Sequence, residues 1–140
     1  MSSRADNFTQ QKNTEDLFSD FTADLSPHPI TGDVVRLRNE RAIRESLRNI
    51  IMTNYGEALF QPNKGSNVNR AIFEMDDEVT ANDLKYHMES TIAAHEPRVQ
   101  LLDVNVQSLP EENKLGVQVI YVIINTQALQ SLNLILRRVR

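Results

Sequence analysis

The chain of 140 residues contains no cysteine. This absence excludes disulfide bonds, thiolate catalysis and cysteine-ligated zinc, and it is compatible with a reducing compartment. No apolar run approaches the roughly eighteen residues that a membrane-spanning helix needs. The polar opening stretch MSSRADNFTQQKNTED lacks the apolar region of a signal peptide. We therefore expect a soluble protein without a membrane partner.

Positive charge is also scarce, since 15 lysines and arginines face 19 acidic residues and leave a net charge of -4. This balance argues against a general nucleic-acid binder. Length and composition predict one globular domain over residues 17–140. Residues 1–16 have almost no apolar anchor, so a flexible tail is predicted there. A local basic cluster nevertheless occurs at Arg36, Arg38, Arg41, Arg44 and Arg48.

Arrangements of residues that are typical of catalytic sites are missing as well. The three histidines have no neighbours at metal-ligand spacing, and no phosphate-binding glycine loop or activated nucleophile occurs. The acidic run Asp76, Asp77 and Glu78 stands where a helix begins, and the helix dipole favours acids there without a catalytic role. We predict no catalytic residue, no metal site and no cofactor, and hence no enzyme.

An extended arm is predicted at residues 17–32. Pro27, Pro29 and Gly32 exclude a regular helix there. The apolar side chains of the arm follow no period, so we expect packing against the domain or a neighbouring protein to hold it. These side chains are Leu17, Phe18, Phe21, Leu25 and Ile30.

Two main helices and one short helix are predicted. The first has Asn39 as its N-cap, Gly56 beyond its end and an apolar stripe of Ile43, Leu47, Ile50 and Ile51. VNRAIFE predicts the short helix. Thr80 and Asp83 indicate a capping box for the last helix. The buried stripe of that helix is predicted to contain Leu84, Met88, Ile92 and His95.

Strands follow the helices. After a short strand in DVVRLRN, alternation predicts one strand with Leu102, Val104 and Val106 on a single face. The next predicted strand, LGVQVIYVII, is apolar on both faces from Val119. We therefore expect other parts of the protein to cover both faces of this strand. A last strand is predicted at residues 132–139. The fold class is therefore α+β, with two main helices and a short helix packed on a small, mostly antiparallel sheet.

The triplet Glu96-Pro97-Arg98 separates the last helix from the first strand of the sheet. Pro97 disfavours helical geometry at the residue before it, which ends the helix. In an extended stretch Glu96 and Arg98 point to the same side and present a carboxylate beside a fork of donors. The sequence leaves two interpretations open: solvated flanks of a helix stop, or a docking plug for a partner that carries the complementary pair.

Four blocks of the sequence resemble one protein family. SPHPITGDV, IRESLRNIIMTN, LFQPNKGSNVNRAIFE and AHEPRVQLLDVNV, in this order and spacing, are similar to the small baseplate wedge protein of contractile-tailed phages. The same family includes the corresponding components of type VI secretion systems and contractile bacteriocins. The resemblance covers residues 17–140, and its most specific part is the Glu-Pro-Arg triplet followed by a strand.

The resemblance implies a structural protein of the virion's tail baseplate, assembled in the host cytoplasm. Its partners would be other baseplate wedge proteins, the tail sheath protein and the central spike or tube-hub proteins. Glu96, Pro97 and Arg98 would form the docking plug, and the last strand would pair with the first sheath ring. Leu134 and Leu136 would face the core there, while Arg137 and Arg138 would keep the edge from self-pairing.

Two alternatives follow from the same resemblance. Some phage members carry a lysozyme label, so a baseplate-associated lysozyme is the alternative from another class of function. A type VI secretion component would have the same mechanics in a bacterial cytoplasm.

Overall fold

The computed structural model describes residues 16–66, 68–73, 78–109 and 112–137, and these residues form an α+β fold, as predicted. The helices are α1 (Glu40–Met52), α2 (Val68–Phe73) and α3 (Glu78–His95). Strands β1 (Ser19–Phe21) and β2 (Arg36–Arg38) form an antiparallel hairpin. A second antiparallel sheet has the order β3-β4-β5 and contains β3 (Val99–Leu109), β4 (Lys114–Ile123) and β5 (Ala128–Arg137).

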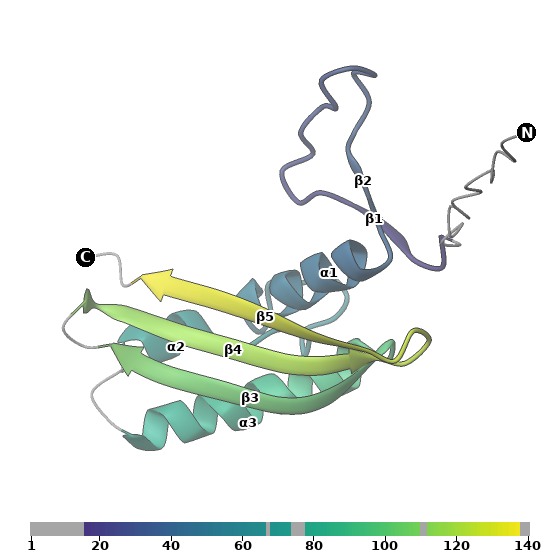
Figure 1. Ribbon diagram of the computed structural model, residues 1–140. Helices are drawn as coiled ribbons and strands as arrows, with labels where there is room; N and C mark the ends of the chain where they lie inside the picture. Colours follow the sequence, from purple (N-terminus) through teal and green to yellow (C-terminus); the bar gives the residue numbers. More distant parts are fainter. Residues whose placement is uncertain (1–15, 67, 74–77, 110–111, 138–140) are drawn as a thin grey trace, which may run out of the picture.

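The helices lie on one face of the three-stranded sheet, and the core fills the space between these two layers (Figure 1). The predicted stripe of α1 is buried there, and so are Leu84, Met88 and Ile92 of α3, which confirms them. His95, the last residue of the predicted α3 stripe, is only half-buried. Burying each large apolar side chain contributes about 1.5–3 kcal/mol. From β4 the core receives Leu115, Val117, Val119, Tyr121 and Ile123. None of the helices in the described ranges could cross a membrane.

Strand β5 lies at one edge of this sheet, since β4 is its only neighbour in the sheet order. The strand begins at Ala128, earlier than the predicted residue 132, and pairs with β4 along its whole length. Leu132 and Leu136 are buried and Leu134 packs half-buried against them, as predicted from the alternation. Among the residues that the structure describes, no strand pairs with the other backbone edge of β5, and such an edge can accept an additional strand.

Two predictions about the sheet were wrong. Leu102 does not share a face with Val104, because a β-bulge between Leu101 and Asp103 shifts the register and leaves Leu102 53% exposed. The expected cover over both faces of β4 is also absent from the described part of the chain. The side chains of Ile120 and Val122 are partly exposed, because all three helices pack on the opposite face.

The arm forms part of a hairpin, and most of its apolar side chains do not pack against the domain. Packing against a neighbouring protein, the other alternative for residues 17–32, stays a prediction. The arm's strand β1 pairs with β2 beside the start of α1, and the loop between the two strands extends away from the helices and the sheet (Figure 1). Of the apolar residues that were predicted to pack, only Phe18 packs against the core. The other predicted contacts are exposed, with Phe21 at 58% and Ile30 at 88%. The predicted tail lies outside the described residues except for Asp16.

Of the two predicted helix caps, the one at Thr80 is wrong and the one at Asn39 is confirmed in position. Helix α3 already begins at Glu78, so Thr80 lies inside the helix and cannot be its N-cap. Asn39 does occupy the N-cap position of α1, but its side chain makes no cap bond to that helix. Its Oδ1 atom accepts hydrogen bonds from the backbone amides of Leu17 and Phe18 at 2.9 and 3.3 Å. The residue chosen as a cap therefore fastens the hairpin to α1.

Candidate docking site

The candidate site is the corner between α3 and β3. The Glu96 amide donates the last bond of the helix to the Ile92 carbonyl at 2.9 Å. Pro97 has no amide to continue this ladder, and β3 begins at Val99. The predicted helix stop at the triplet is therefore confirmed. The backbone carbonyl of Arg98 accepts from the Ile124 amide at 3.1 Å, which fastens the corner to the end of β4.

The Glu96 carboxylate is buried, with a residue exposure of 2%, and it lies beside the Arg98 guanidinium as the extended geometry predicted. Arg98 Nε and a terminal nitrogen donate to its two oxygens at 2.5 and 2.6 Å. The Ser46 hydroxyl, from α1, donates to Glu96 Oε2 at 2.6 Å. One carboxylate thus joins α1 to the corner.

The charges at this corner stabilise one another. Burial by itself would raise the pKa of Glu96, but the hydrogen bonds from Arg98 and Ser46, together with the Arg98 charge, hold that pKa below its ordinary value. Hydrogen bonding to Glu96 raises the pKa of Arg98. The pair is therefore ionised in the folded protein at neutral pH.

The outer side of the corner remains accessible. Pro97 is exposed and the Arg98 side chain keeps 30% of its surface exposed. The guanidinium carbon of Arg98 also lies 5.5 Å from the centre of the Phe18 ring, a cation–π distance. Because an arginine has five donor hydrogens and Glu96 takes only part of them, Arg98 can still donate to a partner.

Sequence reasoning missed two residues of this site. Ser46 is a small polar residue next to the buried Leu47 on α1, and nothing in the pattern distinguishes it from a solvated serine. Phe18 was expected to pack, but its place against Arg98 depends on the hairpin. Only the tertiary fold brings both residues to the Glu96–Arg98 pair.

The predicted site residues fall at two separate ends of the sheet. The corner lies at the end where Val99 faces Ile123 and Ile123 faces Ala128. Arg137 lies at the opposite end, where it faces Lys114, and its side chain is exposed. Leu134 and Leu136 point into the core along the same strand. Arg138 lies outside the described residues. The corner and the basic end of β5 therefore form two distinct surfaces.

No group of three metal-ligating side chains occurs within the described ranges. The contacts of the corner are hydrogen bonds, an ion pair and a ring contact, and these can position a partner chain.

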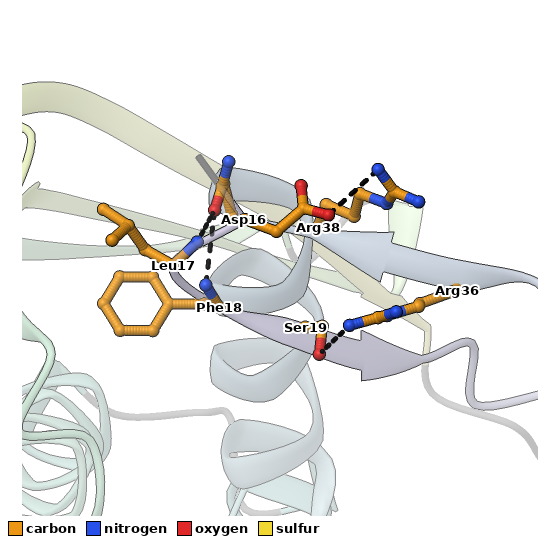
Figure 2. Close-up of polar contacts among 7 residues, drawn as sticks. Asp16, Leu17, Phe18, Ser19, Arg36 and Arg38 are labelled. Atoms are coloured by element: carbon orange, nitrogen blue, oxygen red, sulfur yellow. Dashed lines mark hydrogen bonds and ion pairs between the residues drawn. The ribbon is translucent and has the colours of Figure 1, made fainter. Parts of the chain in front are cut away.

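The hairpin base offers a direct test of how the arm is fastened (Figure 2). Asn39 has a φ of 49°, a left-handed value that glycine adopts without strain. Asn39→Gly should therefore keep the backbone and remove the side-chain bonds to the amides of Leu17 and Phe18. We expect faster hydrogen exchange of these two amides and a loss of about 1 kcal/mol or less in global stability. Unchanged exchange would contradict the role of this side chain.

Comparison with known proteins identifies the family. The family described as Baseplate wedge protein gp25 matches residues 37–128. The Baseplate wedge protein gp25 of Enterobacteria phage T4 is 32% identical over 93 residues, which cover 66% of this chain and 70% of the phage protein. The hairpin up to Arg36 precedes the region that matches the family.

Two solved structures share the fold. A candidate tail lysozyme from Geobacter sulfurreducens has a TM-score of 0.63 at 24% identity, over 74% of this chain and 96% of that chain. A chain of the anti-feeding prophage baseplate has a TM-score of 0.60 at 24% identity, over 84% of this chain and 83% of that chain. These likenesses agree with the family match in fold. The chain therefore belongs to the Baseplate wedge protein gp25 family, the structural baseplate proteins of contractile tails.

Proposed function

We propose that this chain is built into the wedge of a phage tail baseplate, where it docks through the Glu96-Pro97-Arg98 corner and starts sheath assembly through β5. The observation that carries the proposal is the family match over residues 37–128, which includes the Glu96-Pro97-Arg98 corner and ends where β5 begins. The protein would act in the virion's tail after assembly in the host cytoplasm. Its partners would be other wedge proteins, the sheath protein and the central spike or tube-hub proteins.

The hydrogen bonds within the corner indicate which of its residues would contact a partner. Glu96 is buried and engaged by Arg98 and Ser46, so it positions the guanidinium and does not itself reach a partner. The contacting surface would be Pro97 and the exposed part of Arg98. Because the corner is already fixed in the free chain, little entropy is lost when a partner binds.

The free edge of β5 supports the second part of the proposal. An added strand would hydrogen-bond with the edge of β5 that faces away from β4 and extend the sheet. The exposed Arg137 at its end would discourage two copies of this chain from pairing with each other, since like charges would meet. A sheath subunit could supply the added strand.

Arg98→Lys tests the docking corner. Lysine keeps the positive charge but lacks the planar fork, so it cannot hold Glu96 through two parallel bonds and contact a partner at the same time. We expect about tenfold weaker binding to wedge proteins, measured by co-purification from cells that produce the other tail proteins.

The matched control is Arg48→Lys, which makes the same change at an exposed position of α1. Thermal unfolding of both purified variants separates docking from folding. Wild-type co-purification of a folded Arg98→Lys protein would remove the corner from the docking surface.

We also expect no glycosidase activity. Glycoside hydrolysis needs two carboxyl groups across a cleft, with one of them kept protonated by an apolar environment. One hollow is lined by Asp20 and Glu57, but both residues are exposed. Purified protein should therefore leave peptidoglycan intact from acidic to neutral pH. Turnover that a single Asp or Glu substitution abolishes would overturn this expectation.

A further inference from the structure

A hollow with a cavity volume of about 480 Å³ lies between the base of the hairpin, the start of α1 and the end of β4. This volume is in the range of sites that hold small ligands or a few amino-acid side chains. Its apolar lining consists of Leu17, Phe18, Ile43 and Ile123. Asn39 holds the amides of Leu17 and Phe18, so this wall of the hollow is preformed (Figure 2).

The rim of the hollow is basic. Arg36, Arg38 and Arg41 line it, against Glu40 as its one carboxylate. Two of the guanidinium groups are held in place: Arg38 pairs with Asp16 at 2.9 Å, and Arg36 donates to the Ser19 hydroxyl at 3.0 Å (Figure 2). The carboxylate of Glu40 accepts from Gln130 at 3.2 Å.

Arg41 differs from the other two arginines. It is exposed, and within the described ranges its guanidinium has no hydrogen bond or ion pair. The hollow thus combines an apolar floor with a cationic group that has donors to offer. The ligand with the complementary chemistry has a carboxylate next to a bulky apolar group.

We infer that this hollow binds an extended segment of a partner protein, in which an acidic side chain neighbours a large apolar one. The apolar side chain would fill the floor beside Leu17 and Ile43, and the carboxylate would accept bonds from Arg41. The hollow touches β5 through the bond between Glu40 and Gln130, but the inference rests on Arg41 and the apolar floor and does not depend on which surface joins the baseplate.

Nucleic acid fits the hollow less well than such a segment. Single strands are bound by aromatic rings on which successive bases stack, along a groove of positive charge. The lining holds one aromatic ring, that of Phe18, and that ring already lies against the Arg98 guanidinium. A net charge of -4 also opposes a polyanion.

The test is a titration of the full, isotope-labelled chain followed by NMR. The probes are an acetylated and amidated peptide Asp-Leu-Asp-Phe and its neutral counterpart Asn-Leu-Asn-Phe, with inorganic phosphate and a short single-stranded DNA in parallel. We expect the acidic peptide to shift the amides of Glu40, Ile123 and Thr126, with at least about tenfold tighter binding than the neutral peptide.

Charge reversal at Arg41 completes the test. Arg41→Glu should weaken the acidic peptide about tenfold or more, whereas Arg48→Glu, the same change on the same helix away from the hollow, should leave its affinity within about twofold. Equal effects of both variants, equal binding of both peptides or shifts elsewhere would overturn the inference. It would also fail if DNA or phosphate shifted the same amides at lower concentration than the acidic peptide.

Discussion

Arg98→Ala is expected to lower the free energy of unfolding of the isolated chain by about 3–5 kcal/mol near neutral pH. The substitution leaves the Glu96 carboxylate, with 2% of the residue exposed, without its opposite charge. Ser46 would then be its one remaining side-chain donor among the bonds that the structure shows. Urea unfolding followed by circular dichroism measures the loss.

The pH dependence distinguishes this explanation from a simple loss of packing. In the wild-type protein the pKa of Glu96 is lowered, so its contribution to stability is present above the ordinary glutamate pKa and is lost as the pH falls through the lowered value. In the variant burial dominates and should raise that pKa, so the buried charge destabilises the fold increasingly as the pH rises above the ordinary value. The two stability curves should therefore converge at acidic pH.

Lys85→Ala is the control, because it breaks an exposed ion pair, in which Lys85 lies 2.9 Å from Asp103. We expect no measurable change in its unfolding midpoint near neutral pH. An Arg98→Ala variant that is as stable as this control, or whose loss is the same at acidic and neutral pH, would show that the buried ion pair does not stabilise the domain.

Proline substitutions in β5 should separate folding of the sheet from its use as an assembly edge. Successive amides of a strand point to opposite sides, so of Leu134 and Ile135 one amide faces β4 and the other faces the free edge. The proline that removes a bond to β4 should destabilise the domain by about 1–3 kcal/mol. The other should leave the domain folded, because an edge strand tolerates proline where its amide faces solvent.

The folded proline variant should nevertheless reduce sheath assembly about tenfold or more, since it removes a donor that the added strand needs. Thermal unfolding shows which proline variant leaves the domain folded, and the alanine substitution at that same position, Leu134→Ala or Ile135→Ala, controls for the lost side chain. Electron microscopy then counts sheathed tails in cells that produce the other tail proteins. Normal sheaths on the folded proline variant would mean that the edge of β5 is not used.

Periodic features of the fold could be predicted from the sequence. The stripe of α1, the stripe of α3 up to Ile92, the helix stop at Pro97 and the alternation of β5 each depend on residues close in sequence, and the structure confirms them. The bulge at Leu102 could not be predicted, because alternation alone does not show where a register shifts. The hairpin was missed because its strands have three residues each and are fastened through Asn39.

The candidate site was predictable only in part. Spacing placed Glu96 and Arg98 on the same side of the corner, and the structure brings them into an ion pair. Burial of Glu96 and its bond to Ser46 depend on the packing of α1 against the corner, which spans 50 positions of the sequence. The triplet alone could therefore not predict that Glu96 is buried and holds Arg98 in place within the domain.

The most direct test of the account is electron cryo-microscopy of an assembled baseplate that contains this chain, at a resolution that traces the backbone. The account predicts that Pro97 and Arg98 are buried against wedge proteins and that a strand of a sheath subunit pairs with the free edge of β5. An assembled, sheathed tail in which the β5 edge faces solvent and the corner touches no other chain would contradict it.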